Sequence, residues 1–185
     1  MIQRIAKLFR SNQPAMSPQP QYHPAPGNRL LEGQVAVVSG AAGLIGGAIT
    51  GELLAQGAYV IALDCDEGGL ANLARRVDSD RLTTRICDLT DADGIAALDI
   101  AQCDVLIHAA GIQFETSSLH DTDEQWGQSL DTNVAGPARL TRKLLPKLIE
   151  RKGNIIMVGS IHAELPSRWA SYSAAKAAQA AMIRE

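Results

Sequence analysis

Short apolar runs rich in β-branched residues alternate with longer Ala- and Leu-rich segments from residue 31 onward. The apolar runs lie at 34–39, 59–64, 82–87, 104–108 and 154–159. Segments with apolar positions at helical spacing lie at about 44–57, 67–77, 91–99 and 122–151, and a last one starts near Ala170. Continuous apolar runs are typical of strands buried on both faces of a sheet. The alternation therefore predicts one doubly wound α/β domain with a parallel sheet over 31–185.

The first 30 residues follow a different pattern. Residues 1–10 place apolar and basic side chains on opposite faces of a short helix. Five of the eight prolines then lie between Pro14 and Pro26, which indicates an extended linker. We expect 1–30 to be a basic, proline-rich, disordered leader. A membrane-surface helix, a partner-docking helix and a targeting peptide stay open as alternatives.

Composition narrows the classes of partner. The chain has 17 basic and 20 acidic residues, a formal charge of −3, which gives no general reason to expect nucleic-acid binding. No run of 18 apolar residues is present, so no stable membrane insertion is expected. Three cysteines without a CxxC pair predict neither a disulfide framework nor a metal site. Reduced, mostly buried thiols fit a cytoplasmic protein.

A glycine-rich turn follows the first predicted strand directly, with the sequence SGAAGLIGG over 39–47. Gly40 allows a sharp turn, Gly43 lets backbone approach a pyrophosphate, and Gly46 lets the next helix pack tightly on the strand. The unpaired N–H groups at the start of that helix can bind phosphate. A strand before the motif and a helix after it favour a dinucleotide site over a simple tight turn.

Asp64 ends the second predicted strand, 18 positions beyond Gly46. A carboxylate at this point can accept both hydroxyls of an adenosine ribose and would repel a 2′-phosphate. No Arg or Lys follows until Arg75, so the sequence favours NAD(H) over NADP(H). A solvated Asp at the end of a strand is the alternative interpretation, and Asp66 and Glu67 are expected to cap the next helix.

A second cluster of reactive side chains lies near the end of the chain. Tyr172 and Lys176 form a Y-x-x-x-K motif whose i, i+4 spacing puts phenol and ammonium on one helix face. Tyrosine ordinarily ionises near about pH 10, and a nearby ammonium favours the phenolate, so Tyr172 can exchange a proton with an alcohol or carbonyl. Ser160 follows an apolar run and can hold the reacting oxygen. Asn133 could anchor a water that feeds protons to the lysine.

In this order, the motifs resemble those of the short-chain dehydrogenase/reductase family of the classical type. They are SGAAGLIG (39–46), Asp64, CDLTD (87–91), HAAG (108–111), Asn133, Ser160 and YSAAK (172–176). The resemblance implies a Rossmann-like fold and a catalytic tetrad of Asn133, Ser160, Tyr172 and Lys176. It implies hydride transfer between NAD(H) and a secondary alcohol or carbonyl substrate, and a possible homo-oligomer. The implied cofactor-binding residues are Gly40, Gly43, Leu44, Ile45, Gly46, Asp64, Asp88, Leu89, Ala109, Ala110, Gly111, Tyr172 and Lys176.

Two departures from the family pattern leave alternatives open. Leu44 occupies the usual central glycine, and the resulting G-x-x-G-x-x-G spacing resembles extended members, many of which are epimerases or dehydratases. His108 replaces the usual Asn of NNAG, and it is either a satisfied histidine at a strand end or part of a proton relay. His162, two residues after Ser160, is either a substrate contact or a surface residue.

The third departure is length. The family fold continues past the YxxxK helix with two more strands and further helices, whereas this sequence stops at Glu185, nine residues after Lys176. We therefore expect a Rossmann-like sheet lacking the last strands, in the order 3-2-1-4-5, with strand five at an exposed edge. A truncated, catalytically inactive nucleotide-binding fragment is the competing hypothesis to an active enzyme.

Overall fold

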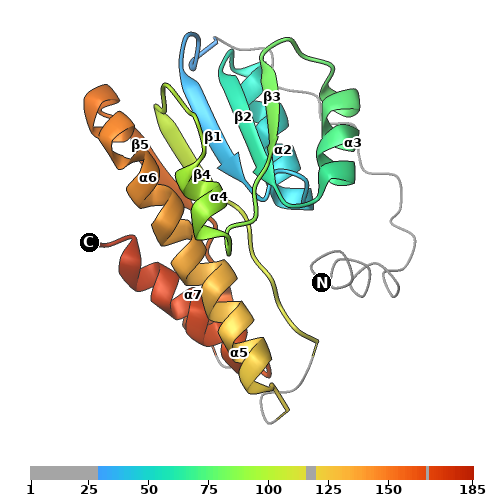
Figure 1. The fold of residues 1–185 in the computed structure, drawn as a ribbon, viewed down its shortest axis with the longest axis vertical. Coiled ribbons are helices and arrows are strands. Elements are labelled where there is room, and N and C mark those ends of the chain that lie inside the picture. The colour runs from blue at the N-terminus through green and yellow to red at the C-terminus, as the bar shows by residue number, and fades with distance from the viewer. Residues whose placement is uncertain (1–28, 116–119, 166) are drawn as a thin grey trace.

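The computed structural model describes residues 29–115, 120–165 and 167–185 (Figure 1). Apart from residues 29 and 30, the predicted leader lies outside the described residues, so that prediction is not tested. Within the described part of the chain, no helix combines the length and the apolar character needed to cross a bilayer.

Five parallel strands form one sheet in the order β3-β2-β1-β4-β5, as predicted. The strands are β1 (Val35–Ser39), β2 (Tyr59–Asp64), β3 (Leu82–Ile86), β4 (Val105–His108) and β5 (Asn154–Met157). The helices are α2 (Leu44–Ala55), α3 (Glu67–Val77), α4 (Ala92–Ala96), α5 (Asp123–Leu130), α6 (Gly136–Arg151) and α7 (Ala170–Met182). The π-helical turn η1 (Asp131–Ala135) joins α5 to α6, and the 3₁₀ turn η2 (Ile161–Ala163) follows β5.

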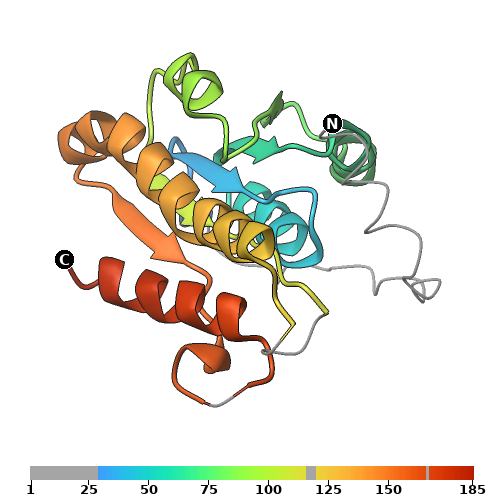
Figure 2. The same cartoon turned by 60° about the horizontal axis from the view of Figure 1, so that its bottom comes forward.

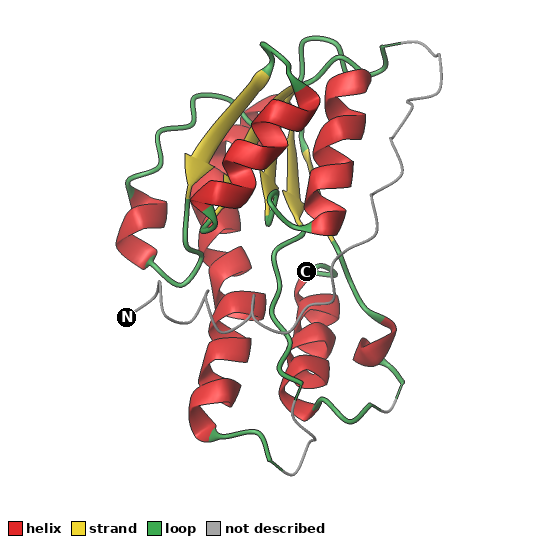
Figure 3. Ribbon diagram, turned by 90° about the vertical axis from the view of Figure 1, so that its right-hand side faces the viewer, coloured by secondary structure: helices red, strands yellow, loops and turns green. Residues whose placement is uncertain are grey.

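Alternate residues of the central strands enter two separate cores, one on each face of the sheet. Ala36 and Val38 of β1 pack with apolar residues of α2 and α3, including Leu53 and Leu73. Val37, between them, packs with the row of leucines on α6 and with Ile95 of α4. The helices therefore cover both faces of the sheet, as Figure 3 shows, and β1 is buried on both sides.

The edge strands differ from the predicted pattern of full burial. Four of the five residues of β3 are exposed, and Ile156 of β5 is half exposed. Each edge strand has a neighbour on one side only within the described sheet. An apolar run therefore identifies these strands correctly but does not report how deeply they are buried.

The predicted helical segment 122–151 is one long rod with an irregular centre. α5 and α6 are joined without a break in helical backbone by η1, where one turn is π-helical. Asn133 lies in this turn and is fully buried. α7 packs beside α5 and η1, and Figure 2 shows it lying below β5. The turn therefore faces the helix that carries the YxxxK motif.

The helices begin in two ways. Side chains cap α3, α4 and α5, where Asp66 accepts from Gly69 N, Asp91 from Asp93 N, and Thr122 forms a capping box with Gln125. α2 follows Gly43 at its N-cap position and has no side-chain cap and no acidic residue in its first turn. Its first N–H groups thus stay available to an anionic group.

Candidate active site

The glycine turn lies against the end of β4. Gly40 has φ +72°, and a Cβ added there would lie 2.7 Å from the carbonyl carbon of Ala109. A Cβ added at Gly46 would lie 2.7 Å from the carbonyl carbon of Gly40. Both distances are too short for a van der Waals contact, so any side chain at these two positions would clash with the backbone. Both glycines are therefore needed for this close packing. The turn and the loop after β4 consequently form two walls of one cleft.

This cleft runs along the carboxyl ends of the central strands, where open α/β sheets bind their ligands. Its lining consists of Ser39, Gly40, Gly43, Leu63, Asp64, Cys65, Cys87, Asp88, Leu89, Ala109, Ala110, Gly111, Ile112 and Thr132. Eight predicted cofactor residues are among them. Five others, Leu44, Ile45, Gly46, Tyr172 and Lys176, are not in the lining.

Two cysteines of the lining were not predicted. Cys65 and Cys87 follow the last residues of β2 and β3, which are paired in register as Asp64 and Ile86. That position at the carboxyl ends of the strands is the signal that would have identified them. Burial, with a further contribution from Asp88, raises the pKa of Cys87 to about 11, so its thiol is protonated at neutral pH.

Asp64 ties the glycine turn to the start of α3. Its Oδ2 accepts from Ala42 N at 2.9 Å, and its Oδ1 accepts from Asp66 N at 3.0 Å. Each carboxylate oxygen has a second acceptor position left for a hydroxyl group. The side chain therefore shapes the cleft as well as lining it.

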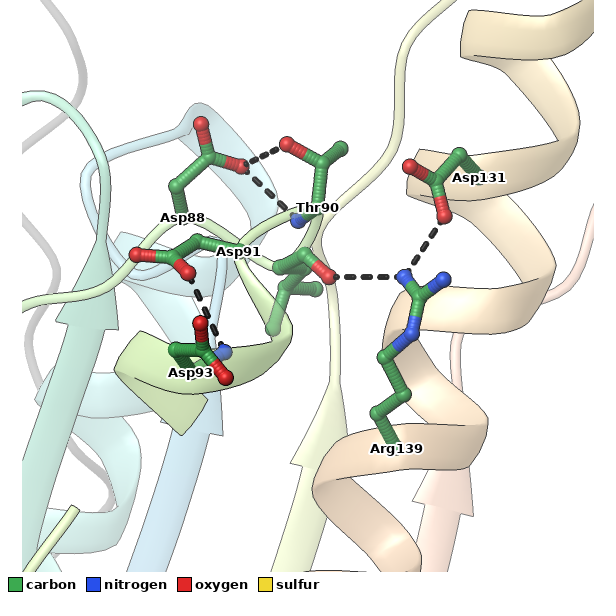
Figure 4. Close-up of polar contacts among 7 residues, drawn as sticks. Asp88, Thr90, Asp91, Asp93, Asp131 and Arg139 are labelled. Carbon is green, nitrogen blue, oxygen red and sulfur yellow. Dashed lines mark hydrogen bonds and ion pairs between the residues drawn. The ribbon is translucent and has the colours of Figure 1, made fainter. Parts of the chain in front are cut away.

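The loop after β3 is held by its own acidic residues and by α6 (Figure 4). Asp88 Oδ1 accepts from both the backbone N and the hydroxyl of Thr90, each at 2.8 Å. Arg139 of α6 donates to the Leu89 carbonyl at 3.4 Å and to Asp131 at 2.6 Å. These bonds fix Asp88 and Leu89 at the cleft, where the family resemblance implies contacts to the cofactor.

Asn133 holds the loop after β4 from the opposite side. Its Oδ1 accepts from Ile112 N and its Nδ2 donates to Ile112 O, both at 3.0 Å. The same Nδ2 donates to Ser129 at 3.2 Å. A fully buried amide bonded on all sides in this way sets the path of the loop that lines the cleft.

Lys176 reaches the same loop from α7. Its side chain is 4% exposed, and its Nζ donates to the Val158 carbonyl at 2.9 Å. A Cβ added at Gly111 would lie 3.8 Å from Nζ and 3.0 Å from the Oδ1 of Asn133. Nζ also lies 5.6 Å from the centroid of the Tyr172 ring. The structure thus brings Tyr172, Lys176 and Asn133 together, and burial lowers the pKa of Lys176.

Ser160 lies beside this group but is bonded elsewhere. Its Oγ accepts from His162 N at 3.2 Å and so caps η2, which packs against α7. Among the described residues, no hydrogen bond joins the hydroxyls of Ser160 and Tyr172. The His162 ring lies edge-on to the rings of Trp169 and Tyr172, with centroids 5.2 and 6.4 Å away. His162 is therefore part of the site's wall and not an isolated surface residue.

His108 is a buried structural histidine. It is 1% exposed, and its Nε2 lies 2.9 Å from the hydroxyl of Thr141 on α6. Its Nδ1 lies 3.5 Å from the hydroxyl of Ser39 on β1. Burial lowers its pKa to about 4, so the ring is neutral at physiological pH. These contacts favour the satisfied-histidine interpretation over a proton relay.

We expect this neutral ring to make stability depend on pH. The unfolded chain takes up a proton on His108 below about pH 6.5, whereas the folded chain resists protonation until about pH 4. The contribution of the neutral His108 ring to folding stability is present above pH 6.5 and is lost as the pH falls from about 6.5 to about 4. The unfolding free energy of the parent chain should therefore fall as the pH is lowered from 7 to 4.5. In His108→Gln this fall should be smaller by about 2 kcal/mol, measured by urea unfolding at both pH values.

The exposed His120 supplies the control for this measurement. His120→Gln makes the same chemical change outside the core, so it should leave the unfolding free energy at pH 7 close to that of the parent chain. If the unfolding free energy fell equally with pH in the parent chain and in His108→Gln, His108 would not contribute to the pH dependence of stability.

Comparisons with known proteins agree with this architecture. Residues 34–185 match the family described as short chain dehydrogenase. An uncharacterized oxidoreductase of Staphylococcus saprophyticus is 31% identical over 159 residues, covering 80% of this chain and 68% of that protein. A 2-keto-3-deoxy-L-fuconate dehydrogenase of Xanthomonas campestris is 34% identical over 161 residues, covering 84% of this chain and 53% of that protein.

A solved structure shows the same arrangement. The crystal structure of an actinorhodin polyketide ketoreductase with NADPH is similar at a TM-score of 0.76 and 27% identity, over 80% of this chain and 62% of that one. The chain spans about half to two thirds of the length of the two curated relatives. The family match, the strand order and the clustered YxxxK residues lead to one conclusion: this chain belongs to the short-chain dehydrogenase/reductase family.

Proposed function

We propose that the chain transfers a hydride between NAD(H) and a secondary alcohol or its carbonyl, using Asn133, Ser160, Tyr172 and Lys176. The observation that carries this proposal is the loop 109–112. It lines the cleft beside the glycine turn, and it also meets both the Asn133 amide and the Lys176 ammonium. One continuous surface therefore connects the proposed nucleotide cleft with the proposed catalytic group.

The residues of the cleft fit a dinucleotide. Gly40 and Gly46 leave no room for side chains, and α2 begins without a side-chain cap. Backbone N–H groups at this point would bind the pyrophosphate, and Asp64 would accept the adenosine-ribose hydroxyls. When bound, the nicotinamide supplies the hydride acceptor or donor.

The catalytic group then handles the proton. In oxidation, the Tyr172 phenolate accepts the proton of the substrate hydroxyl, and in reduction the phenol donates it to the developing alkoxide. The Lys176 ammonium lies 5.6 Å from the centroid of the Tyr172 ring and would bond the ribose of the nicotinamide. Ser160 would hold the reacting oxygen through its hydroxyl, which requires it to exchange its bond with His162 N for one with the substrate.

Asp64 supports NAD(H) rather than NADP(H). Its carboxylate lies at the cleft, and the turn beside it carries Ala41 and Ala42 where a basic residue would be needed to neutralise a 2′-phosphate. The related ketoreductase structure holds NADPH, so the family alone does not decide between the two cofactors. The substrate class that we propose is the secondary alcohol or carbonyl, and self-association stays a prediction.

Turnover and binding together test the proposal. The purified chain is mixed with NAD⁺ and a panel of secondary alcohols, including sugar acids and 3-hydroxyacyl thioesters, and formation of reduced nicotinamide is followed by absorbance. NADH binding is measured in parallel by fluorescence. Turnover of at least one panel member supports the enzyme. NADH binding without turnover of any alcohol or ketone supports the nucleotide-binding fragment, and tightly retained NAD without net redox change supports the epimerase-type alternative.

A further inference from the structure

Two of the three cysteines stand opposite each other at the ends of neighbouring strands. Asp64 and Ile86 are register partners in the parallel pair of β2 and β3, which lie side by side in Figure 1, and Cys65 and Cys87 each follow by one residue. The ladder continues past this pair, because Cys87 N donates to the Asp64 carbonyl at 2.9 Å. Neighbouring strands lie about 4.7–4.9 Å apart. The backbones of the two cysteines are therefore separated by about one strand spacing.

Their side chains belong to the same side of the sheet. Leu63, two residues before Cys65, packs in the same core as Cys87, and side chains two apart on a strand share a face. Both cysteines also line the cleft. Cys65 is one of the groups whose charge raises the pKa of Cys87, so the two sulfur atoms interact electrostatically. The thiols are thus neighbours in space as well as in register.

This placement meets the geometric requirement for a disulfide. Disulfides join cysteines whose Cα atoms are roughly 4.4–6.8 Å apart, and one strand spacing falls within that range. The third cysteine does not share the site. Cys103 is 0% exposed and lies just before β4, at the amino end of a parallel strand and away from the cleft lining. It supplies an internal control for any reaction of the other two.

The two thiols differ in access. Cys65 is exposed, whereas Cys87 is 8% exposed, so a small oxidant reaches Cys65 first. Burial, with repulsion from Asp64 and Asp88, raises the pKa of Cys65 to about 11. Protonated thiols react slowly with oxidants, which keeps the pair reduced while oxidant is scarce. Thiolates of high pKa are also poor leaving groups, so a disulfide between these two cysteines would exchange slowly once formed.

We propose that Cys65 and Cys87 form a modification site, a thiol pair that hydrogen peroxide oxidises to a disulfide within the cleft. The Cys65 thiolate attacks one peroxide oxygen and the O–O bond breaks, which gives a sulfenic acid and one water. The Cys87 sulfur then attacks the sulfenic sulfur, and the S–S bond forms as hydroxide leaves and takes the Cys87 proton to form a second water. The two thiols together lose two electrons, and the peroxide gains them.

The disulfide should interfere with the cofactor. It would join the segments that carry Asp64 and Asp88, and the exposed Cys65 side chain would have to turn toward Cys87 across the cleft that both residues line. This consequence rests on the proposed function, which assigns the adenosine of NAD(H) to these residues. Formation of the disulfide itself does not depend on it.

Peptide mapping tests the modification site. The reduced parent chain is treated with hydrogen peroxide at pH 8, the remaining thiols are alkylated after unfolding, and the chain is cleaved before aspartate. This cleavage releases residues 64–65 and 80–87 and separates Cys87 from Cys103, because Asp88 lies between them. The expected product is the peptide 64–65 joined to 80–87 and lacking two hydrogens, with Cys103 recovered alkylated.

Two variants provide the comparison. Cys103→Ala should give the same joined peptide, and Cys65→Ser should give none. NADH affinity is measured by fluorescence before peroxide, after peroxide and after dithiothreitol. Peroxide should weaken NADH binding by about tenfold in the parent chain and in Cys103→Ala, reversibly, and change it by less than about twofold in Cys65→Ser.

The outcomes separate this proposal from the proposed function. Oxidation of Cys65 to a sulfinic acid without the joined peptide overturns the thiol pair, and so does a dimer linked through Cys65 on a non-reducing gel. The joined peptide with unchanged NADH affinity overturns the effect on the cofactor. If the reduced parent chain binds no NADH, the proposed function fails, while the joined peptide still supports the modification site.

Discussion

Replacing Tyr172 with phenylalanine should lower kcat for alcohol oxidation by about 1,000-fold while leaving NADH binding within about twofold. General acid–base catalysis by a positioned side chain contributes roughly 100- to 10,000-fold, and the phenol oxygen is the only part of the residue removed. The ring, against which Lys176 Nζ lies at 5.6 Å and His162 at 6.4 Å, stays in place. The variant therefore separates proton transfer from packing.

The measurement is steady-state turnover of the best substrate from the alcohol panel, with NADH affinity determined by fluorescence. Tyr59→Phe is the matched control, because Tyr59 lies at the start of β2, at the opposite end of the strand from the cleft, and is half exposed. It should keep the kcat of the parent chain. A Tyr172→Phe variant with parental kcat would assign the proton transfer to another group, and His162 would be the first to examine.

The strands could be predicted because each signal was local, whereas their order in the sheet was implied by the family resemblance. Every predicted strand is present, and their boundaries agree to within two residues. The glycine turn was also predictable, because the φ of +72° at Gly40 and the close approach at Gly46 are requirements that few residue types meet. Asp66 caps α3, as expected from its position before an amphipathic segment.

What the sequence did not predict depends on contacts between distant segments. The exposure of β3 was not predicted because burial depends on its position at the sheet edge, although Thr83, Thr84 and Arg85 are a local sign of it. The π-helical turn was not expected within 122–151, although Pro137 four residues after Asn133 is a local sign of an irregular hydrogen-bond pattern. Gln179 has no motif of its own, although its buried amide donates to the backbone carbonyl of Asn133, 46 residues away.

The arrangement of the proposed catalytic residues is predictable only for some of them. Spacing placed Tyr172 and Lys176 on one helix face, and the structure confirms that ammonium and ring are neighbours. Spacing could not show that Asn133 and Ser160 would be bonded to Ile112 and His162. These bonds depend on how the loops after β4 and β5 fold against α7.

Cofactor preference should change strongly when Asp64 becomes asparagine. The ratio of kcat/KM for NADP⁺ to that for NAD⁺ should rise by about 10- to 100-fold, equivalent to roughly 1.4–2.7 kcal/mol. The reason is electrostatic: like charges about 6 Å apart repel by roughly 3 kcal/mol at an effective dielectric constant of about 20. Asparagine removes the charge and keeps nearly the same shape.

A ratio is the right quantity because Asp64 also supports the glycine turn. The carboxylate accepts from both Ala42 N and Asp66 N, and an asparagine can accept with only one of its two terminal atoms. Loosening of the turn should weaken both cofactors alike and cancel in the ratio. The charge effect does not cancel, since only NADP⁺ carries the 2′-phosphate.

Asp66→Asn provides the control that separates a local contact from a general change in charge. It removes one negative charge two residues away, and asparagine is about as good an N-cap as aspartate, so α3 keeps its bond to Gly69 N. Its cofactor ratio should stay within about threefold of the parent value. If both variants raised the ratio equally, the preference would reflect the summed charge of the cleft. If neither did, Asp64 would serve the turn alone and NAD(H) specificity would have to come from another residue.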